Sequence, residues 1–162
     1  MSNAPILNYT TQKNTVEVLL KQLKTDYSTI VFTNGCFDIL HVGHLRILNE
    51  ARKLGEILIL GLNSDSSIKQ LKGSNRPIVN QIDRSEILSN FRCIDYIVIY
   101  DDESVYDLVS FIKPDVLVKG GDYTIQQVVG HDIVESYGGQ VITVPFVDNN
   151  STTDLLKKVI AL

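Results

Sequence analysis

Five short apolar runs recur along the chain and alternate with segments of helical periodicity. The runs cover residues 29–33, 56–62, 94–100, 115–118 and 140–144. Their apolar residues are nearly continuous rather than alternating, which is typical of strands buried on both faces of a parallel sheet. Repetition of strand, helix and strand predicts a three-layer, Rossmann-like α/β fold with right-handed crossovers. We therefore expect a five-stranded, mainly parallel sheet.

The segments between the runs carry helix start and stop signals. Asn80 is a candidate N-cap, Thr124-x-x-Gln127 is a capping box, and Gly55 and Pro114 stand where helices end. The predicted helices cover residues 16–23, 45–54, 82–91, 104–112, 128–137 and 151–160. We expect one domain overall, in which residues 1–27 form an N-terminal segment whose amphipathic helix packs on the unit formed by residues 28–162.

Composition excludes several classes of protein. Of 162 residues, 44% are hydrophobic and 21% are charged, so the chain can offset the entropy of ordering and is not disordered. A formal net charge of −4 without a basic stripe disfavours a nucleic-acid-binding protein. Two cysteines are too few for a disulfide framework. No apolar run approaches the length of a membrane span, and no signal peptide is visible, so we expect a cytoplasmic protein without membrane contact.

Two of the three histidines stand together where a strand passes into a helix, in the string Thr33-Asn-Gly-Cys-Phe-Asp-Ile-Leu-His-Val-Gly-His44. Free backbone N–H groups at the start of a helix attract anions, and Gly43 lets a phosphate approach the backbone. His41 and His44 share one face of the first turn, where they can hydrogen-bond a phosphoryl group. A zinc site is disfavoured because further ligands at suitable spacing are missing, so we predict no metal held by protein residues alone.

Ligands of such folds bind beyond the carboxyl ends of the strands. Lys119-Gly120-Gly121 follows a predicted strand there, and its glycines permit backbone contact with a base or ribose. A tight turn that needs positive φ is the alternative interpretation. Ser151-Thr152-Thr153 opens the last predicted helix, where hydroxyl and N–H groups can hold a phosphate, although helix capping alone explains Ser151.

Several strings together resemble the heptose 1-phosphate adenylyltransferases, a family of the cytidylyltransferase-like nucleotidyltransferase superfamily that occurs alone or as the C-terminal half of a bifunctional heptose kinase/adenylyltransferase. The resemblance covers residues 28–160. The strings are Phe32-Thr-Asn-Gly-Cys-Phe-Asp38 with the His-x-Gly-His signature, Asn63-Ser-Asp65, Leu71-Lys-Gly73 with Arg76-Pro77, Val118-Lys-Gly-Gly-Asp-Tyr123 and Ser151-Thr-Thr153. Residues 146–150 lack the arginine of the related cytidylyltransferases, which disfavours a cytidylyl donor.

The resemblance implies roles for individual residues. His41, His44 and the mobile-loop lysine, Lys72, would be catalytic. The implied nucleotide-binding residues are Thr33, Asn34, Gly35, Cys36, Phe37, His41, Gly43, His44, Lys119, Gly120, Gly121, Ser151, Thr152 and Thr153. The implied substrate-binding residues are Asp38, Asn63, Asp65, Lys72, Arg76 and Arg84. A solvated loop lysine remains the alternative for Lys72, and a surface charge on a helix the alternative for Arg84.

The implied reaction is adenylyl transfer from ATP to D-glycero-D-manno-heptose 1-phosphate, giving ADP-heptose and pyrophosphate, with Mg²⁺ and without a covalent enzyme intermediate. The product would serve lipopolysaccharide or another glycan. We expect a separate upstream heptose kinase to supply the sugar 1-phosphate, and a homodimer or higher homo-oligomer. Two alternatives stay open. One is another transferase of the superfamily, such as a glycerol-3-phosphate cytidylyltransferase or an FAD synthetase, and the other is a non-catalytic nucleotide-binding protein.

Overall fold

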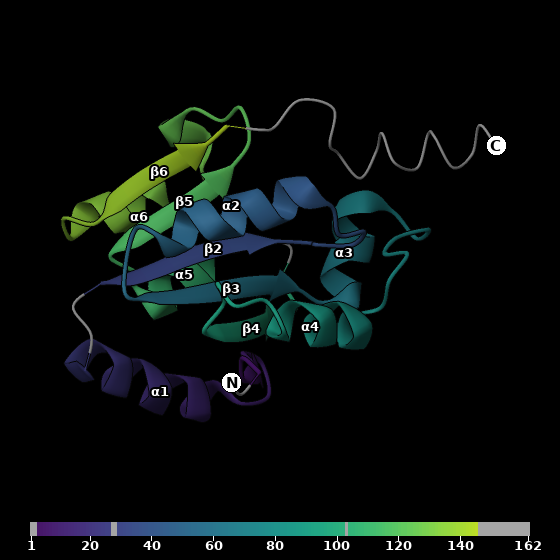
Figure 1. Cartoon of the computed structure of the whole chain (residues 1–162), viewed down its shortest axis with the longest axis horizontal. Coiled ribbons are helices and arrows are strands. Elements are labelled where there is room, and N and C mark those ends of the chain that lie inside the picture. The colour runs from purple at the N-terminus through teal and green to yellow at the C-terminus, as the bar shows by residue number, and fades with distance from the viewer. Residues whose placement is uncertain (1–2, 27–28, 103, 146–162) are drawn as a thin grey trace.

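The computed structural model describes residues 3–26, 29–102 and 104–145 of the chain (Figure 1). The strands in this part are β1 (Ile6–Asn8), β2 (Ile30–Gly35), β3 (Ile57–Asn63), β4 (Tyr96–Tyr100), β5 (Val116–Gly120) and β6 (Gln140–Val144). The helices are α1 (Lys13–Asp26), α2 (Val42–Arg52), α3 (Asp65–Lys72), α4 (Gln81–Ser89), α5 (Tyr106–Ile112), the 3₁₀ turn η1 (Ile125–Gln127) and α6 (His131–Ser136).

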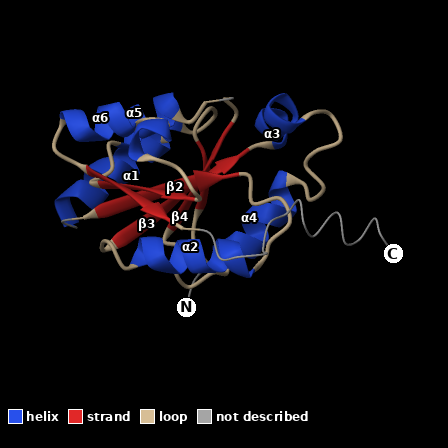
Figure 2. Cartoon of the chain, turned by 90° about the horizontal axis from the view of Figure 1, so that it is seen from above, coloured by secondary structure: helices blue, strands red, loops and turns tan. Residues whose placement is uncertain are grey.

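The strands form one six-stranded sheet in the order β1-β4-β3-β2-β5-β6, and every neighbouring pair is parallel. Figure 2 shows the sheet edge-on, with α1, α5 and α6 on one face and α2 and α4 on the other. The three-layer, Rossmann-like α/β architecture predicted from the apolar runs is therefore confirmed. Right-handed crossovers stay a prediction from the general preference of parallel strands joined by helices.

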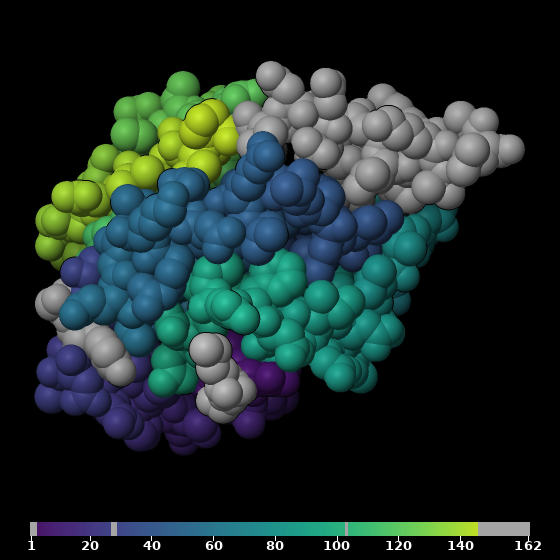
Figure 3. Space-filling model, viewed as in Figure 1, coloured from purple at the N-terminus to yellow at the C-terminus, as the bar shows by residue number. Residues whose placement is uncertain are grey.

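Each face of the sheet has its own apolar core. On one face, Leu20 of α1 and Leu108 of α5 pack with the β2 residue Phe32. On the other, Leu48 of α2 packs with Val31 and Val118. All seven residues of β3 are buried, because this strand lies inside the sheet between β4 and β2 and is covered on both faces. That arrangement explains why the sequence shows a continuous apolar run there. Figure 3 shows the surface of the face that α2 and α4 cover.

The predicted number of five strands is wrong, because β1 adds a sixth along β4. With three residues and no apolar run, β1 carries no strand signal of its own. The expected N-terminal amphipathic helix is present as α1, which buries Val16, Leu20 and Leu23.

The helices differ from the prediction at two places. The capping box on Thr124 and Gln127 is formed, but it caps the 3₁₀ turn η1. Gly130, with φ of 88°, separates that turn from α6, so residues 128–137 are not one helix. Helix α3 was not predicted at all, although the Ser64 hydroxyl accepts a hydrogen bond from Ser67 N–H as an N-cap. The helix predicted over residues 151–160 lies outside the described residues.

We predict that Gly61→Ala destabilises the fold by about 1–3 kcal/mol, the usual cost of overpacking a core. A Cβ at position 61 would lie 2.6 Å from Cζ of Phe32 and 3.2 Å from Cβ of Asn34. Urea unfolding measures the change. Combining Gly61→Ala with Phe32→Leu, which shortens the obstructing side chain, should cost less than the sum of the two single variants. Strict additivity would show that the Phe32 ring is not the obstacle.

Candidate active site

A cavity of about 500 Å³ opens at the carboxyl ends of β2, β3, β4 and β5. Asn34 and Gly35 reach it from the end of β2, Asn63 from β3, Tyr100 from β4, and Lys119 with Gly120 from β5. The described residues that line it are Thr33, Asn34, Gly35, Cys36, Phe37, His44, Ile47, Asn63, Leu71, Lys72, Tyr100, Ser104, Val105, Lys119, Gly120, Tyr123, Gln127, Val128 and Val129. This is the edge at which parallel α/β sheets bind ligands.

The two histidines lie stacked at the start of α2. Their ring centroids are 3.8 Å apart with planes at 25°, and Phe37 lies against His44 with ring centroids 5.0 Å apart. His41 is the N-cap residue, but its side chain makes no capping bond. The Nδ1 atoms of both rings are buried and have no hydrogen-bond partner among the described residues. Both Nδ1 atoms therefore lack the hydrogen-bond partner that buried polar atoms normally have.

Burial keeps both imidazoles neutral near pH 7. It lowers the pKa of His41, and it lowers the pKa of His44 to about 4, with smaller contributions from the neighbouring His41 and Lys72. A neutral imidazole carries one N–H donor and one acceptor nitrogen, so it can donate to a phosphoryl oxygen.

A chain of polar side chains runs across the sheet at the base of the cavity. Lys119 Nζ donates to Asn34 Oδ1 over 3.3 Å, and Asn34 Nδ2 donates to the Tyr100 hydroxyl over 3.1 Å. Asn34 pairs in register with Gly61 of β3, whose missing side chain leaves room for the Asn34 amide to reach Tyr100 on β4. Burial lowers the pKa of Lys119 and raises the pKa of Tyr100 to about 12, so the phenol stays protonated.

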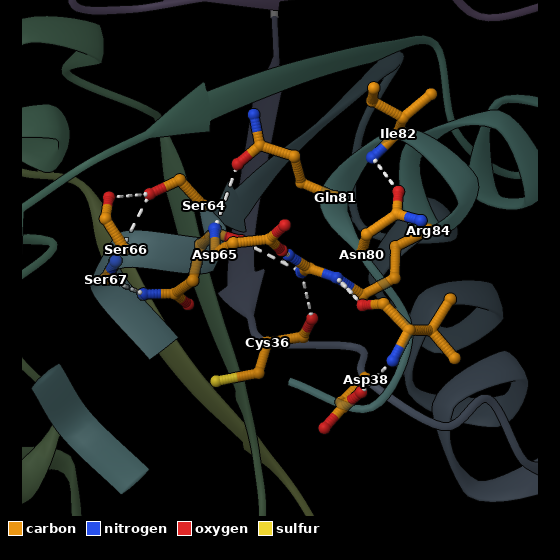
Figure 4. A network of polar contacts seen from close by, with 12 residues as sticks. Cys36, Asp38, Ser64, Asp65, Ser66, Ser67, Asn80, Gln81, Ile82 and Arg84 are labelled. Carbon is orange, nitrogen blue, oxygen red and sulfur yellow. Dashed lines mark hydrogen bonds and ion pairs between the residues drawn. The ribbon is translucent and has the colours of Figure 1, made fainter. Parts of the chain in front are cut away.

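Arg84 connects the segments after β2 and β3 with the segment before α4 through its hydrogen bonds (Figure 4). Its guanidinium is 1% exposed and donates to four acceptors. These are the carbonyl oxygens of Val79, Cys36 and Asn63, at 2.9, 2.6 and 2.9 Å, and Oδ1 of Asp65, at 2.7 Å. Arg84 is thus a buried residue that cross-links these segments rather than a surface charge. Its guanidinium donates to protein groups instead of facing the cavity.

Asp38 makes a second set of contacts that hold the segments at this edge together. It is 3% exposed, and its Oδ2 accepts bonds of 2.6 Å from both Nε and Nη2 of Arg76. Its Oδ1 accepts from the backbone N–H groups of Ile78 and Val79. Asp38 therefore holds the loop between α3 and α4 against the turn after β2, and Arg76 lies in an ion pair beside the cavity rather than in its lining.

Lys72 is the last residue of α3, so its predicted place in a loop is wrong. The helix ends at Gly73, whose φ of 91° is a conformation that glycine adopts readily. The Lys72 side chain lines the cavity and is exposed at its mouth. Its charge lowers the pKa of both His44 and Lys119, which places the ammonium within electrostatic reach of both.

The two glycines after β5 do different things. An added Cβ at Gly120 would lie 2.3 Å from Cδ1 of Ile47, so this glycine allows α2 to pack closely against β5. Gly121 has a φ of 132°, which fits the tight-turn interpretation, and its N–H donates to the Val144 carbonyl oxygen. Of these two glycines, only Gly120 lines the cavity.

Of the predicted site residues that the structure describes, more than half line this cavity. Thr33, Asn34, Gly35, Cys36, Phe37, His44, Asn63, Lys72, Lys119 and Gly120 line it. His41 stacks on the lining residue His44, whereas Gly43, Asp38, Asp65, Arg76, Arg84 and Gly121 are not in the lining. Ser151, Thr152 and Thr153 lie outside the described residues. Sequence reasoning did not assign to the site the wall formed by Tyr100, Ser104, Val105, Tyr123 and residues 127–129, although Tyr123 ends one of the family strings and Gln127 belongs to the capping box.

The described residues do not form a preorganised metal-binding site. No group of three or more His, Cys, Asp or Glu side chains is placed to hold an ion in this part of the chain. The described lining of the cavity contains no Asp or Glu either. Its charged side chains are lysines, which repel cations and attract anions. No helix within the described ranges is long and apolar enough to cross a membrane.

The family model described as cytidylyltransferase-like matches residues 32–156. Among curated proteins, the Bifunctional protein HldE of Syntrophotalea carbinolica is 52% identical over 132 residues, and that of Geobacter metallireducens is 54% identical over 131. These alignments cover 82% and 81% of this chain but 27% of each relative. The chain thus spans little more than a quarter of the length of these relatives.

Solved structures agree on the fold. A lipopolysaccharide core biosynthesis protein from Thermoplasma volcanium has a TM-score of 0.59 and 28% identity, covering 75% of this chain and 98% of that one. Pantoate-beta-alanine ligase from Francisella tularensis has a TM-score of 0.62 over 99% of this chain and 79% of that one. At 14% identity, the second likeness shows the fold alone.

We predict that folding stability falls as the pH drops from about 6.5 to about 4, partly because of His44. The pKa of His44 is lowered from 6.5 to about 4, so in this window the unfolded chain binds a proton that the folded chain does not. The contribution is present above pH 6.5 and is lost toward pH 4. The free energy of unfolding, measured with urea at several pH values in this range, should change less steeply with pH for His44→Gln than for wild type; equal slopes would contradict the prediction.

In His41→Gln, NMR should show the pKa of His44 moving up, because a neighbouring charge is removed.

We predict that Arg84→Lys destabilises the fold by about 1–3 kcal/mol, because a single ammonium cannot reach the four acceptors of the guanidinium. Chemical denaturation measures the loss. Arg46→Lys is the matched control, since Arg46 is an exposed arginine on α2, and it should change stability by less than about 0.5 kcal/mol. Equal effects of the two variants would show that the network contributes nothing particular.

Proposed function

The chain belongs to the cytidylyltransferase-like family of nucleotidyltransferases, and from this premise we propose that it transfers the adenylyl group of ATP to D-glycero-D-manno-heptose 1-phosphate. The observation that carries the proposal is the composition of the cavity. A stacked, neutral histidine pair and two lysines meet at the carboxyl edge of the sheet, and the described lining contains no acid. Such a site suits phosphate groups whose negative charge shifts during reaction.

The choice of sugar and base rests on the strings that resemble heptose 1-phosphate adenylyltransferases. The high identity to proteins named Bifunctional protein HldE and the likeness to a lipopolysaccharide core biosynthesis protein support it. The reaction would supply ADP-heptose for lipopolysaccharide or another glycan. It requires a kinase that makes the sugar 1-phosphate, on another chain or on another part of a longer protein. A homodimer or higher homo-oligomer remains our expectation.

In the proposed reaction, an oxygen of the sugar 1-phosphate attacks the α-phosphorus of ATP. A new phosphorus–oxygen bond forms while the bond to the bridging oxygen of the β-phosphate breaks, and pyrophosphate leaves with that oxygen. The attacking phosphate is already anionic near neutral pH, so no general base is needed. Positioning and charge stabilisation would therefore supply the catalysis.

Each proposed catalytic residue has a defined task in this step. His41 and His44 would donate hydrogen bonds to the triphosphate from the start of α2, where free N–H groups also favour anions. Lys72, at the mouth of the cavity, would offset the negative charge that grows on the leaving group. The segments 33–37 and 119–121, together with Ser151, Thr152 and Thr153, would hold the nucleotide.

Magnesium would arrive with the nucleotide. The described residues do not form a cage for it, and Mg²⁺ is often bound mainly through substrate phosphates and water. When bound, it would neutralise part of the charge of the triphosphate.

We predict that the protein releases pyrophosphate from ATP only when Mg²⁺ and the heptose 1-phosphate are both present. Mass spectrometry of sugar 1-phosphates paired with ATP, CTP, GTP and UTP identifies donor and acceptor together. Transfer from CTP alone would favour a cytidylyltransferase. Folded protein that binds ATP but transfers it to no acceptor would favour the non-catalytic interpretation and contradict the proposal.

His44→Ala should lower kcat by about 10²–10³-fold, the usual loss on removing one hydrogen-bond donor to a transition state. His131→Ala is the matched control, because that histidine begins α6 and does not line the cavity; it should keep nearly the full rate. Thermal melting verifies that both variants are folded. A near wild-type rate for His44→Ala would remove this imidazole from the mechanism.

A further inference from the structure

The cavity has two sides that the sheet itself defines. Successive side chains of a strand point to opposite faces. Lys119 stands two residues after Leu117 and Asn34 two residues after Phe32, and both Leu117 and Phe32 pack in the core on the α1 and α5 face. Tyr100 belongs to that same core. The chain of Lys119, Asn34 and Tyr100 therefore lies on the face covered by α1, α5 and α6.

The histidines lie on the opposite side. Helix α2, which carries His44, packs through Leu48 against Val31 and Val118 on the other face of the sheet. The carboxyl edge of β2 and β5 thus separates an imidazole side from an ammonium side. Both sides open into the same cavity, because His44 and Lys119 both line it.

Lys119 is a half-buried cation that makes no ion pair with the described part of the chain. Its recorded hydrogen bond goes to the neutral amide of Asn34, at 3.3 Å. None of the ion pairs among the described residues includes Lys119 or Lys72. Burying a charge without a counter-charge is costly, so this lysine does not serve stability.

Two positive groups act on the same space. Burial lowers the pKa of Lys119, the neighbouring Cys36 raises it, and the charge of Lys72 lowers it further, so the two ammonium groups lie within electrostatic reach of each other. A phosphate dianion bound to Lys119 would replace that repulsion with a charge-assisted hydrogen bond. The wall beyond them, formed by Tyr100, Val105, Tyr123 and Val128, suits the carbon and hydroxyl surface of a sugar.

We propose that Lys119 is a specificity-determining residue that binds the phosphate of the acceptor substrate, on the side of the cavity opposite the histidines. The inference rests on the proposed function, because it takes the nucleotide phosphates to lie at the start of α2. In-line transfer needs the attacking and leaving oxygens on opposite sides of the α-phosphorus. An acceptor phosphate held by Lys119 attacks from the α5 side, while pyrophosphate leaves toward the histidines. The backbone of 119–121 remains free to contact the nucleotide.

Steady-state kinetics of Lys119→Met test the proposal. The KM for heptose 1-phosphate should rise about 10- to 100-fold, which is the effect of losing one charge-assisted hydrogen bond, while the KM for ATP changes less than twofold. Lys69→Met removes the same charge from an exposed position on α3 and should change neither constant. A rise in the KM for ATP alone, or no change in either constant, overturns the proposal.

Thermal melting separates this role from a structural one. Removing a half-buried charge that makes no ion pair should leave the melting temperature of Lys119→Met unchanged or higher. A clear fall in melting temperature, with both KM values raised, would mean that Lys119 acts through the structure of the cavity, and it would overturn a direct role in acceptor binding.

A binding measurement keeps the test independent of turnover. Inorganic phosphate is titrated by calorimetry into protein saturated with α,β-methylene-ATP, which occupies the nucleotide side. Wild type should bind phosphate at least tenfold more tightly than Lys119→Met. If wild type transfers nucleotide to no acceptor, the proposed function fails, but this titration still tests the phosphate site. Tighter binding by wild type than by Lys119→Met supports a phosphate site at Lys119, and equal binding overturns it.

Discussion

The guanidinium of Arg84 lies where the segments after β2 and β3 leave the sheet and where α4 begins. Burying it costs several kcal/mol unless its charge and donors are satisfied. Asp65 supplies the counter-charge, and three backbone carbonyl oxygens accept the remaining bonds. Two of those carbonyls belong to Cys36 and Asn63, which line the cavity. One buried cation thereby sets the positions of two walls of the site.

The order of strands decides where the cavity forms. From β2 the chain moves outward through β3 to β4, and then returns to place β5 on the other side of β2. Connections leave β2 and β5 in opposite directions along the sheet, and ligands bind in the crevice at such a switch point. Asn34 and Lys119 stand at the ends of these two strands and are joined by a hydrogen bond. Topology therefore brings together groups that are 85 positions apart in the sequence.

Sequence patterns predicted what depends on neighbouring residues. The apolar run of β3 and the N-cap of α4 at Asn80 are local signals, and both elements formed where they were expected. The pairing of β1 with β4, the ion pair of Asp38 with Arg76, and the burial of Arg84 depend on contacts between distant segments. A spacing rule cannot distinguish an arginine that binds a substrate from one that binds backbone carbonyls. The wall at Tyr100 and Tyr123 was missed for the same reason.

A net charge of −4 by itself disfavours the binding of the two phosphorylated substrates that we propose. Charges separated by more than about 8 Å are largely screened at physiological ionic strength, so the surface acids act weakly on the cavity. Lys119 is half-buried, which reduces that screening, and the described lining around it contains no acid. The same burial that lowers the pKa of this ammonium also strengthens its attraction for an anion at contact distance. The phosphate affinity that we propose would therefore be a property of a few enclosed groups, and composition alone does not reveal it.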